Sequence, residues 1–271
     1  MAIWEYGAIS RDSPFLIRSS ACPFCGETLT LLTSDKSEEV LDHPQHYLIF
    51  QDELEVVVCG TCGWWKAMKV LRTHTFPPRG DGPSSLSGRL STNYYGAAAS
   101  LKELDLSDIS TPLAEVMSYL TAKYESRFAI HPRILEETVA SVFRDMGYDV
   151  LVTAYSGDSG IDVIMTQRST HIGVQVKRYR DSIKAEQIRS LAGALVLNGL
   201  TRGIFVATSS FQKGAIKSAD QYGQLGYDID LIDGERFLEA LKITQRAMYQ
   251  SKGHFVKVHD LRTLPFIEQR P

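Results

Sequence analysis

The stretch Gly157–Arg180, GDSGIDVIMTQRSTHIGVQVKRYR, contains two apolar runs, IDVIM and HIGVQV, separated by the polar segment TQRST. This pattern predicts a β-hairpin. Polar side chains occur where buried strands normally carry apolar ones: Asp162 lies one residue into the first run, and Gln175 and Lys177 close the second. Because side chains alternate along a strand, Gln175 and Lys177 lie on the same face.

The register of this hairpin decides whether the polar residues meet. A turn centred on Arg168 and Ser169 places Asp162 directly across from Gln175, with their Cβ atoms about 5 Å apart. Oxygen ligands with a lysine beside them suit a hard divalent cation and an activated water. A shift of one residue would send one strand's polar groups to the opposite face, so the predicted site depends on this register.

A helix is predicted in front of the hairpin. Pro132 begins the segment PRILEETVASVFRDM, and Gly147 ends it. Glu136 lies at the edge of the apolar face and Glu137 on the polar face, so a carboxylate that reaches an internal site would be Glu136. The alternative interpretation is that both are acids near a helix N-terminus, favoured there by the helix dipole.

Strands and helices continue after the hairpin. Apolar runs predict strands over residues 148–153, 203–208 and 227–232, and helices over 183–198, 211–222 and 235–241. The order α-β-β-β-α-β-α-β-α indicates an α/β (α+β) fold: a mixed sheet flanked by helices. Its last strands are expected to be parallel neighbours, because helices connect them.

All four cysteines lie in two CxxC motifs, CPFCG and CGTCG, each followed by glycine. Two such motifs hold one tetrahedral Zn²⁺, and the glycine lets backbone amides turn toward the sulfurs. No cysteine is left over and the N-terminal residues lack a secretory signal, so a structural zinc site of the zinc-ribbon type is favoured over disulfides. The predicted zinc ligands are Cys22, Cys25, Cys59 and Cys62.

Two alternatives stay open for the cysteine motifs and their surroundings. The motifs could be redox-active, or His43 or His46 could replace one cysteine as a ligand. Trp64 and Trp65 follow the second motif. They either stack on a nucleic-acid base or cover the zinc site and a small core, and we favour the second interpretation.

The sequence predicts four segments. A zinc-ribbon-like domain occupies residues 1–75, and a linker with a connecting helix occupies 76–130, where residues 76–91 are rich in Pro, Gly and Ser. The α/β domain is expected over 131–245 and a C-terminal tail over 246–271.

Composition restricts the class of protein. The chain has 271 residues, of which 44% are hydrophobic and 23% charged, as in ordinary globular proteins. No apolar run is long enough to span a bilayer, so we expect a cytoplasmic protein without membrane association. The net charge of −3 excludes a generally basic DNA-coating protein. Residues 131–271 nevertheless carry +2 and residues 1–130 carry −5, which favours the second part as the one facing a polyanion.

The segments GDSGIDVI, VQVKRY, GIFVATS and IDLIDGERF, with LEETVASVFRDMGY in front, together resemble the Mrr-type restriction endonuclease domain. That domain belongs to the PD-(D/E)-x-K nuclease superfamily, and the resemblance covers residues 131–242. Asp162 corresponds to the family's metal-binding aspartate, Lys177 to its lysine and Glu136 to its helical acid. Gln175 stands where most of the superfamily has glutamate and where Mrr-like members commonly have glutamine.

The sequence departs from the family at two positions. Ser159 stands where the family usually has glycine, and Val176 stands where it often has cysteine. Alternation along the strand points Val176 into the core, so we expect that departure to be mild.

The resemblance implies a restriction-endonuclease-like fold and Mg²⁺-dependent hydrolysis of DNA phosphodiester bonds, used in restriction of foreign or modified DNA. Mg²⁺ would be held by Asp162, the Gln175 amide oxygen, a backbone carbonyl near Val176 and, directly or through water, Glu136. Lys177 would orient the attacking water and stabilise negative charge. One carboxylate fewer than usual predicts weak metal affinity.

A basic run follows the second strand of the hairpin. These residues are expected to bind phosphates of double-stranded DNA, the alternative being a solvated charged face. Duplex cleavage usually needs two active sites, so a homodimer on DNA is expected. The competing functions are a repair or recombination nuclease of the same fold, and a non-catalytic DNA-binding adaptor. The candidate DNA-binding residues are Arg178, Arg180, Lys184 and Arg189.

Overall fold

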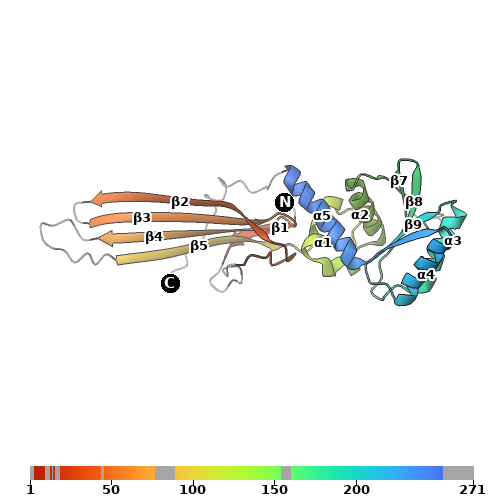
Figure 1. Ribbon diagram of the computed structural model, residues 1–271. Coiled ribbons are helices and arrows are strands. Elements are labelled where there is room, and N and C mark those ends of the chain that lie inside the picture. The colour runs from red at the N-terminus through yellow and green to blue at the C-terminus, as the bar shows by residue number, and fades with distance from the viewer. Residues whose placement is uncertain are drawn as a thin grey trace. The chain divides into compact units, whose positions relative to one another are not determined.

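The chain forms two compact units in a computed structural model. The structure describes residues 3–9, 13, 15, 19–43, 46–76, 89–153 and 160–252. Unit 1 consists of Met1–Lys102 together with Tyr249–Pro271, and unit 2 consists of Glu103–Met248. Unit 1 contains an antiparallel sheet, whereas unit 2 contains a mixed sheet and most of the helical residues (Figure 1). No helix in the described ranges is both long and apolar enough to cross a membrane.

Unit 1 is built on a five-stranded sheet with the order β1-β5-β4-β3-β2, in which all neighbours are antiparallel. Its apolar core lies at the end of the sheet that carries the cysteines, where Val56, Val58 and Ala67 are buried. Towards the other end of β2 the side chains are exposed. The strands are β1 (Trp4–Ala8), β2 (Leu29–His43), β3 (His46–Cys59), β4 (Trp65–Phe76) and β5 (Arg89–Leu101).

Strand β5 lies in the segment 76–130, where the sequence analysis expects a linker and a connecting helix. It pairs with β4 from Lys66↔Ala98 to Thr75↔Arg89 and with β1 on its other side, so it completes the sheet. The connecting helix exists as α1 (Leu113–Ala122). The predicted domain boundaries stay predictions. Of the C-terminal tail expected over 246–271, residues 246–252 belong to α5 (Gly234–Lys252), and the rest lies outside the described residues.

Unit 2 follows the predicted order of elements from its second helix onward. Its sheet has the order β10-β9-β8-β7-β6; β8, β9 and β10 are parallel neighbours, and β6, β7 and β8 are antiparallel. The mixed fold expected from the sequence is therefore confirmed. After α1 come the 3₁₀ helix η2 (Tyr124–Phe128), α2 (Pro132–Asp145), β6 (Asp149–Val152), β7 (Val163–Gln167), β8 (Thr170–Lys177), α3 (Ala185–Leu197), β9 (Arg202–Ala207), α4 (Lys213–Gln224), β10 (Asp228–Ile232) and α5 (Gly234–Lys252).

Helices cover both faces of this sheet (Figure 1). The α3 and α4 helices share a core with Phe205 and Ala207 of β9, in which Leu191 and Leu195 are fully buried. Truncating such a leucine to alanine typically costs about 2–5 kcal/mol, so this core fixes β9 against α3. Leu195 also packs on β8, where a Cβ atom at Gly173 would lie 2.9 Å from its Cδ2. The α2 helix contacts β6, β7 and β8. The hairpin is therefore held from both sides.

Candidate active site and candidate metal centre

The β7–β8 hairpin has the register that the sequence predicts. Val163 pairs with Val174 and Gln167 with Thr170, around a turn in which Arg168 adopts a left-handed φ of 56°. Continuing this register by one residue brings Asp162 opposite Gln175. The Asp162 backbone N–H donates to the Val174 carbonyl at 2.9 Å, which holds Asp162 against β8.

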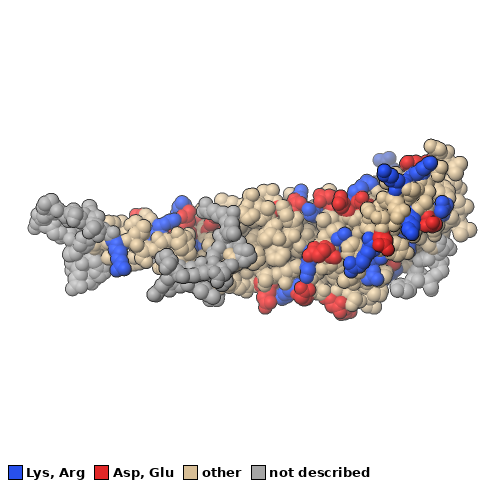
Figure 2. All heavy atoms as spheres, turned by 90° about the horizontal axis from the view of Figure 1, so that it is seen from below, with Lys and Arg blue, Asp and Glu red and all other residues tan. Residues whose placement is uncertain are grey.

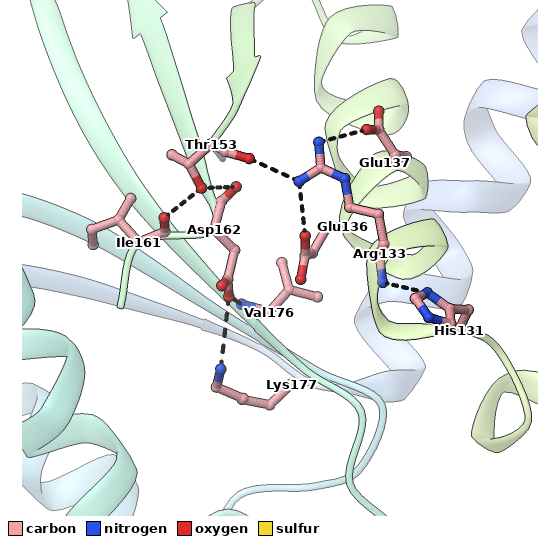
Figure 3. Close-up of polar contacts among 9 residues, drawn as sticks. All are labelled: His131, Arg133, Glu136, Glu137, Thr153, Ile161, Asp162, Val176 and Lys177. Carbon is pink, nitrogen blue, oxygen red and sulfur yellow. Dashed lines mark hydrogen bonds and ion pairs between the residues drawn. The ribbon is translucent and has the colours of Figure 1, made fainter. Parts of the chain in front are cut away.

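The Asp162 carboxylate is fixed by β8. It is only 6% exposed, and its Oδ2 atom accepts a hydrogen bond of 2.6 Å from the backbone N–H of Val176. The Lys177 Nζ lies 3.9 Å from the same oxygen (Figure 3). Thr153, just past the end of β6, donates its backbone N–H and its hydroxyl to the Asp162 carbonyl at 3.0 and 2.9 Å. Both the backbone and the carboxylate of Asp162 are therefore oriented before any ligand binds.

Gln175 is buried beside this carboxylate, with 5% exposure. Its Nε2 donates to the Gly160 carbonyl at 2.9 Å, which defines the orientation of the amide and turns Oε1 to the opposite side. Gly160 has a φ of +88°, and a Cβ atom there would lie 3.4 Å from Gln175 Nε2. A side chain at this position would be strained and would crowd the amide, so glycine is needed to hold Gln175 in place.

The α2 helix contributes Glu136 to the same region. The side chain of Glu136 is 18% exposed and that of Glu137 is 36% exposed, in line with the predicted positions of the two acids relative to the apolar face. Figure 3 shows the Glu136 carboxylate on the side of α2 that faces Asp162. The helix starts where the sequence predicts, with the N–H of Arg133 donating to the Nδ1 atom of His131 at 3.2 Å.

Arg133 is a member of the site that the sequence analysis does not identify. One of its terminal nitrogens lies 3.3 Å from Glu136 Oε2 and donates to the Thr153 carbonyl at 2.8 Å, and the other lies 3.1 Å from Glu137 Oε1 (Figure 3). Its spacing of three and four residues from the two acids is the helical signal that could have identified it. The arginine links α2 to the end of β6 and so to Asp162.

The electrostatics of the site favour a bound cation. Burial raises the pKa of Glu136, and the negative charge of Asp162 raises it further, while Arg133 and Lys177 act in the opposite direction. Two carboxylates are thus held close enough to repel each other in a partly buried setting. A divalent cation bound by these oxygens would relieve that repulsion.

The four candidate DNA-binding residues are all exposed, but they differ in what holds them. Arg178 donates to the Ile130 carbonyl at 2.8 Å, and the Arg180 guanidinium lies 4.8 Å from the centre of the Phe128 ring. Lys184 precedes α3 and Arg189 lies on it. On the face shown in Figure 2, lysines and arginines are interspersed with acids over unit 2, so any DNA contact there is local.

The four cysteines form a compact cluster in unit 1. Their sulfur atoms all lie within 4.8 Å of one another, and the Cys22–Cys62 and Cys25–Cys59 pairs are 3.5 and 3.4 Å apart. Sulfurs around a tetrahedral zinc are about 3.8 Å apart for Zn–S bonds of about 2.3 Å, so the donor set fits this ion. No disulfide joins any of the four cysteines in the structure, which favours the metal site over the disulfide alternative.

The two CxxC motifs have the same backbone geometry. Gly26 and Gly63 adopt φ values of 76° and 79°, and each donates its N–H to the carbonyl of the first cysteine of its motif at 3.0 Å. Hydrogen bonding with the other sulfurs, first with Cys22, lowers the pKa of Cys59 and raises that of Cys62. A bound Zn²⁺ would hold the sulfurs as thiolates and remove this competition for protons.

Histidine ligation and base stacking in unit 1 are not supported. His43 pairs with His46 at the opposite end of the β2–β3 hairpin from the Leu29↔Cys59 pair, roughly 45 Å away at about 3.3 Å per residue. Trp64 and Trp65 are buried, at 2% and 5% exposure. Trp64 donates its indole N–H to the Ala99 carbonyl at 2.9 Å, and Trp65 stacks on Tyr6, so both tryptophans are part of the core of unit 1.

Comparison with known families finds a match within unit 2. Residues 128–241 match the family model described as restriction endonuclease, the catalytic domain of the Mrr type. This range covers every element from α2 to the first turns of α5 and contains the whole hairpin site. Of the two departures from the family pattern, Val176 is buried as expected, and Ser159 lies outside the described residues. A search of curated proteins found no match to the chain.

Proposed function

We propose that this protein, whose residues 128–241 form a restriction endonuclease domain of the Mrr type, is a Mg²⁺-dependent DNA endonuclease that restricts foreign or modified DNA. The observation that carries the proposal is the geometry of the hairpin. Asp162 Oδ2 and Lys177 Nζ lie 3.9 Å apart. The Gln175 amide, on the same strand as Lys177, and the Glu136 carboxylate, on α2, lie beside them.

The donor set suits Mg²⁺ in kind and number. Asp162 and Glu136 offer carboxylate oxygens, Gln175 offers its amide oxygen, and a backbone carbonyl near Val176 completes the ligands that the chain supplies. When bound there, Mg²⁺ neutralises charge that develops on the phosphate and lowers the pKa of a coordinated water. The Val176 N–H bond to Asp162 and the Gly160 bond to Gln175 keep two of these ligands in place without the ion.

Lys177 has the position of a residue that acts on the nucleophile and on the phosphate. Its side chain is 33% exposed, in contrast to the 8% exposure of the Asp162 side chain. The ammonium group can therefore reach a substrate while it remains paired with Asp162. We assign to Lys177 the orientation of the attacking water and the stabilisation of negative charge on the phosphorus-bound oxygens.

Exposed cations immediately downstream provide the contact with the DNA backbone. Four of them lie within twelve residues of Lys177: Arg178, Arg180, Lys184 and Arg189. The DNA phosphates that they bind would therefore flank the scissile bond. Because cleavage of both strands usually needs two active sites, we propose that the protein acts on double-stranded DNA as a homodimer.

The cysteine cluster is proposed to hold one structural Zn²⁺. Cys22, Cys25, Cys59 and Cys62 leave no open coordination position for a substrate, which is typical of a structural site rather than a catalytic one. Unit 1 would then owe part of its stability to the ion.

The experiment that tests the proposal is cleavage of plasmid DNA, methylated and unmethylated, by the purified protein with Mg²⁺, Mn²⁺ or EDTA. We expect nicked and linear products with either ion and none with EDTA. DNA binding without cleavage under every condition would instead support the non-catalytic adaptor. Cleavage of branched or damaged DNA in preference to intact plasmid would support a repair or recombination nuclease.

A further inference from the structure

A second candidate site lies in unit 2 next to the strand that carries Lys177. It is a cavity of about 400 Å³, within the range of roughly 300–1,000 Å³ that is usual for small-ligand sites. The 3₁₀ helix η2, the segment that follows β9 and the start of α5 line it, together with Arg180 from the segment after β8. None of the residues proposed above to bind Mg²⁺ belongs to its lining.

Planar groups form one part of the cavity wall. The Arg127 guanidinium lies 4.6 Å from the centre of the Tyr124 ring and 4.1 Å from that of Phe128, and Arg180 lies 4.8 Å from Phe128. Arg127 is further fixed by hydrogen bonds to the carbonyls of Thr208 and Tyr124 at 2.9 and 3.1 Å. These four side chains form a ring–guanidinium wall, and aromatic rings and guanidinium groups are the side chains on which nucleobases commonly stack.

Acidic side chains lie opposite in charge to the two arginines in the rest of the wall. Asp233 and Glu235 balance the charges of Arg127 and Arg180. The Asp233 carboxylate already accepts the N–H of Arg236 at 2.9 Å, whereas the exposed Glu235 side chain makes no hydrogen bond or ion pair within the described ranges. These negatively charged carboxylates would repel a phosphate group. An uncharged planar group with donors and acceptors along its edge matches the cavity better.

The backbone connects this cavity to the catalytic strand. The Thr208 N–H donates to the Lys177 carbonyl at 3.1 Å, and the hydroxyls of Thr208 and Ser209 donate to the carbonyls of Tyr179 and Asp181 at 2.9 and 2.8 Å. Arg180 follows Lys177 by three residues, a span of about 10 Å at most. Successive bases of one DNA strand are about 3.4 Å apart along the helix axis, so this backbone span corresponds to no more than about three nucleotides.

We propose that this cavity binds a single unpaired nucleobase of the DNA substrate, stacked on the ring–guanidinium wall and hydrogen-bonded along its edge to Glu235. The inference rests on the proposed function, because it takes DNA at the Lys177 site as the substrate. Enzymes that take a base out of the duplex use this combination of aromatic stacking and edge contacts. The carboxylate favours bases with an exocyclic amino group.

The test uses two duplexes of one sequence, one fully paired and one with 2-aminopurine opposite an abasic site, so that the base is already unpaired. Affinities and 2-aminopurine fluorescence are measured with the full-length Asp162→Asn protein, which keeps the DNA intact. We expect the unpaired duplex to bind about tenfold more tightly or better, with quenching as the base stacks. Phe128→Leu should abolish the preference and the quenching, and Glu235→Gln, an exposed and structurally mild change, should reduce the preference. The control Arg144→Met should change neither.

Equal affinity for the two duplexes, or a preference that Phe128→Leu and Glu235→Gln both leave intact, would overturn the nucleobase site. Plasmid cleavage by the wild-type protein would then still support the proposed endonuclease. A protein that binds neither duplex and cuts no plasmid would refute the proposed function and this inference together.

Discussion

Replacing Gln175 by glutamate should destabilise unit 2 in the absence of a metal ion. The Nε2 donor to the Gly160 carbonyl is lost, which costs about 1 kcal/mol or more. The new charge lies about 5 Å from Asp162, a repulsion of about 3 kcal/mol at an effective dielectric constant of about 20. The new carboxyl group can instead take up a proton, which at neutral pH costs about 4 kcal/mol because the usual pKa of glutamate is about 4.3. The total loss in the free energy of unfolding is therefore limited to about 4 kcal/mol.

We therefore expect Gln175→Glu to lower the Tm of unit 2 in EDTA by roughly 8–16 °C at neutral pH. The loss should shrink as the pH falls towards 4, because the introduced carboxyl group, once protonated, carries no charge and can again donate to the Gly160 carbonyl. In Mg²⁺ the added carboxylate should recover the stability and lower the Mg²⁺ concentration needed for half-maximal cleavage about tenfold or more.

The assay is thermal unfolding followed by the helical circular dichroism signal, because α1–α4 all belong to unit 2. Gln221→Glu, an exposed change on α4, is the matched control and should leave both Tm and Mg²⁺ dependence unchanged. An unaltered Tm in EDTA together with an unaltered Mg²⁺ requirement would refute the placement of Gln175 at the metal site.

Three further outcomes follow from the contacts described above. Glu136→Gln should raise the Tm in EDTA, because burial and Asp162 raise the pKa of Glu136 and its ionised form therefore lowers stability at neutral pH. The same variant should lose the Mg²⁺-induced rise in Tm of about 3–5 °C that we expect for the wild type when Mg²⁺ is in tenfold excess over Kd. Retention of that rise would contradict the role of Glu136 as a ligand. Arg133→Gln should slow cleavage about 10–100-fold and raise the Mg²⁺ requirement, with partial rescue by Arg133→Lys, whereas equal kinetics for Arg133→Gln and the exposed control Arg144→Gln would reduce Arg133 to a structural residue. Metal analysis should find about one Zn²⁺ per chain, and chelation or Cys59→Ser should shift tryptophan emission to longer wavelengths, because all three tryptophans are buried in unit 1; an unshifted spectrum from metal-free protein would exclude a structural zinc.

The local part of the site could be predicted from the sequence because strand alternation and turn position fix it. A hairpin that turns at Arg168 and Ser169 has one register that buries the apolar residues of both strands, and that register brings Asp162 opposite Gln175. The acid on α2 could be chosen in the same way, since a 3.6-residue period puts Glu136 nearer the apolar face than Glu137.

The rest depends on contacts between segments that no local pattern encodes. The segment that forms β5 contains YYGAAAS, which lacks the alternation of a typical strand; its pairing with β1 and β4 makes it one. The partners of Arg133 include the Thr153 carbonyl, which only the packing of α2 against β6 brings within reach. The ring–guanidinium wall likewise combines η2 with Arg180 from the segment after β8.

A comparison of Asp162→Asn with Asp149→Asn in Mg²⁺-dependent plasmid cleavage decides whether the Asp162 carboxylate is needed for cleavage. An asparagine at 162 can still accept the Val176 N–H, so the fold should persist while one metal-binding charge is lost. Asp149 is exposed at the other end of the β6–β7 pairing, where it faces Thr166. We expect wild-type cleavage by Asp149→Asn and a loss of at least about 100-fold for Asp162→Asn, with DNA binding retained. Equal cleavage rates for the two variants would contradict this expectation.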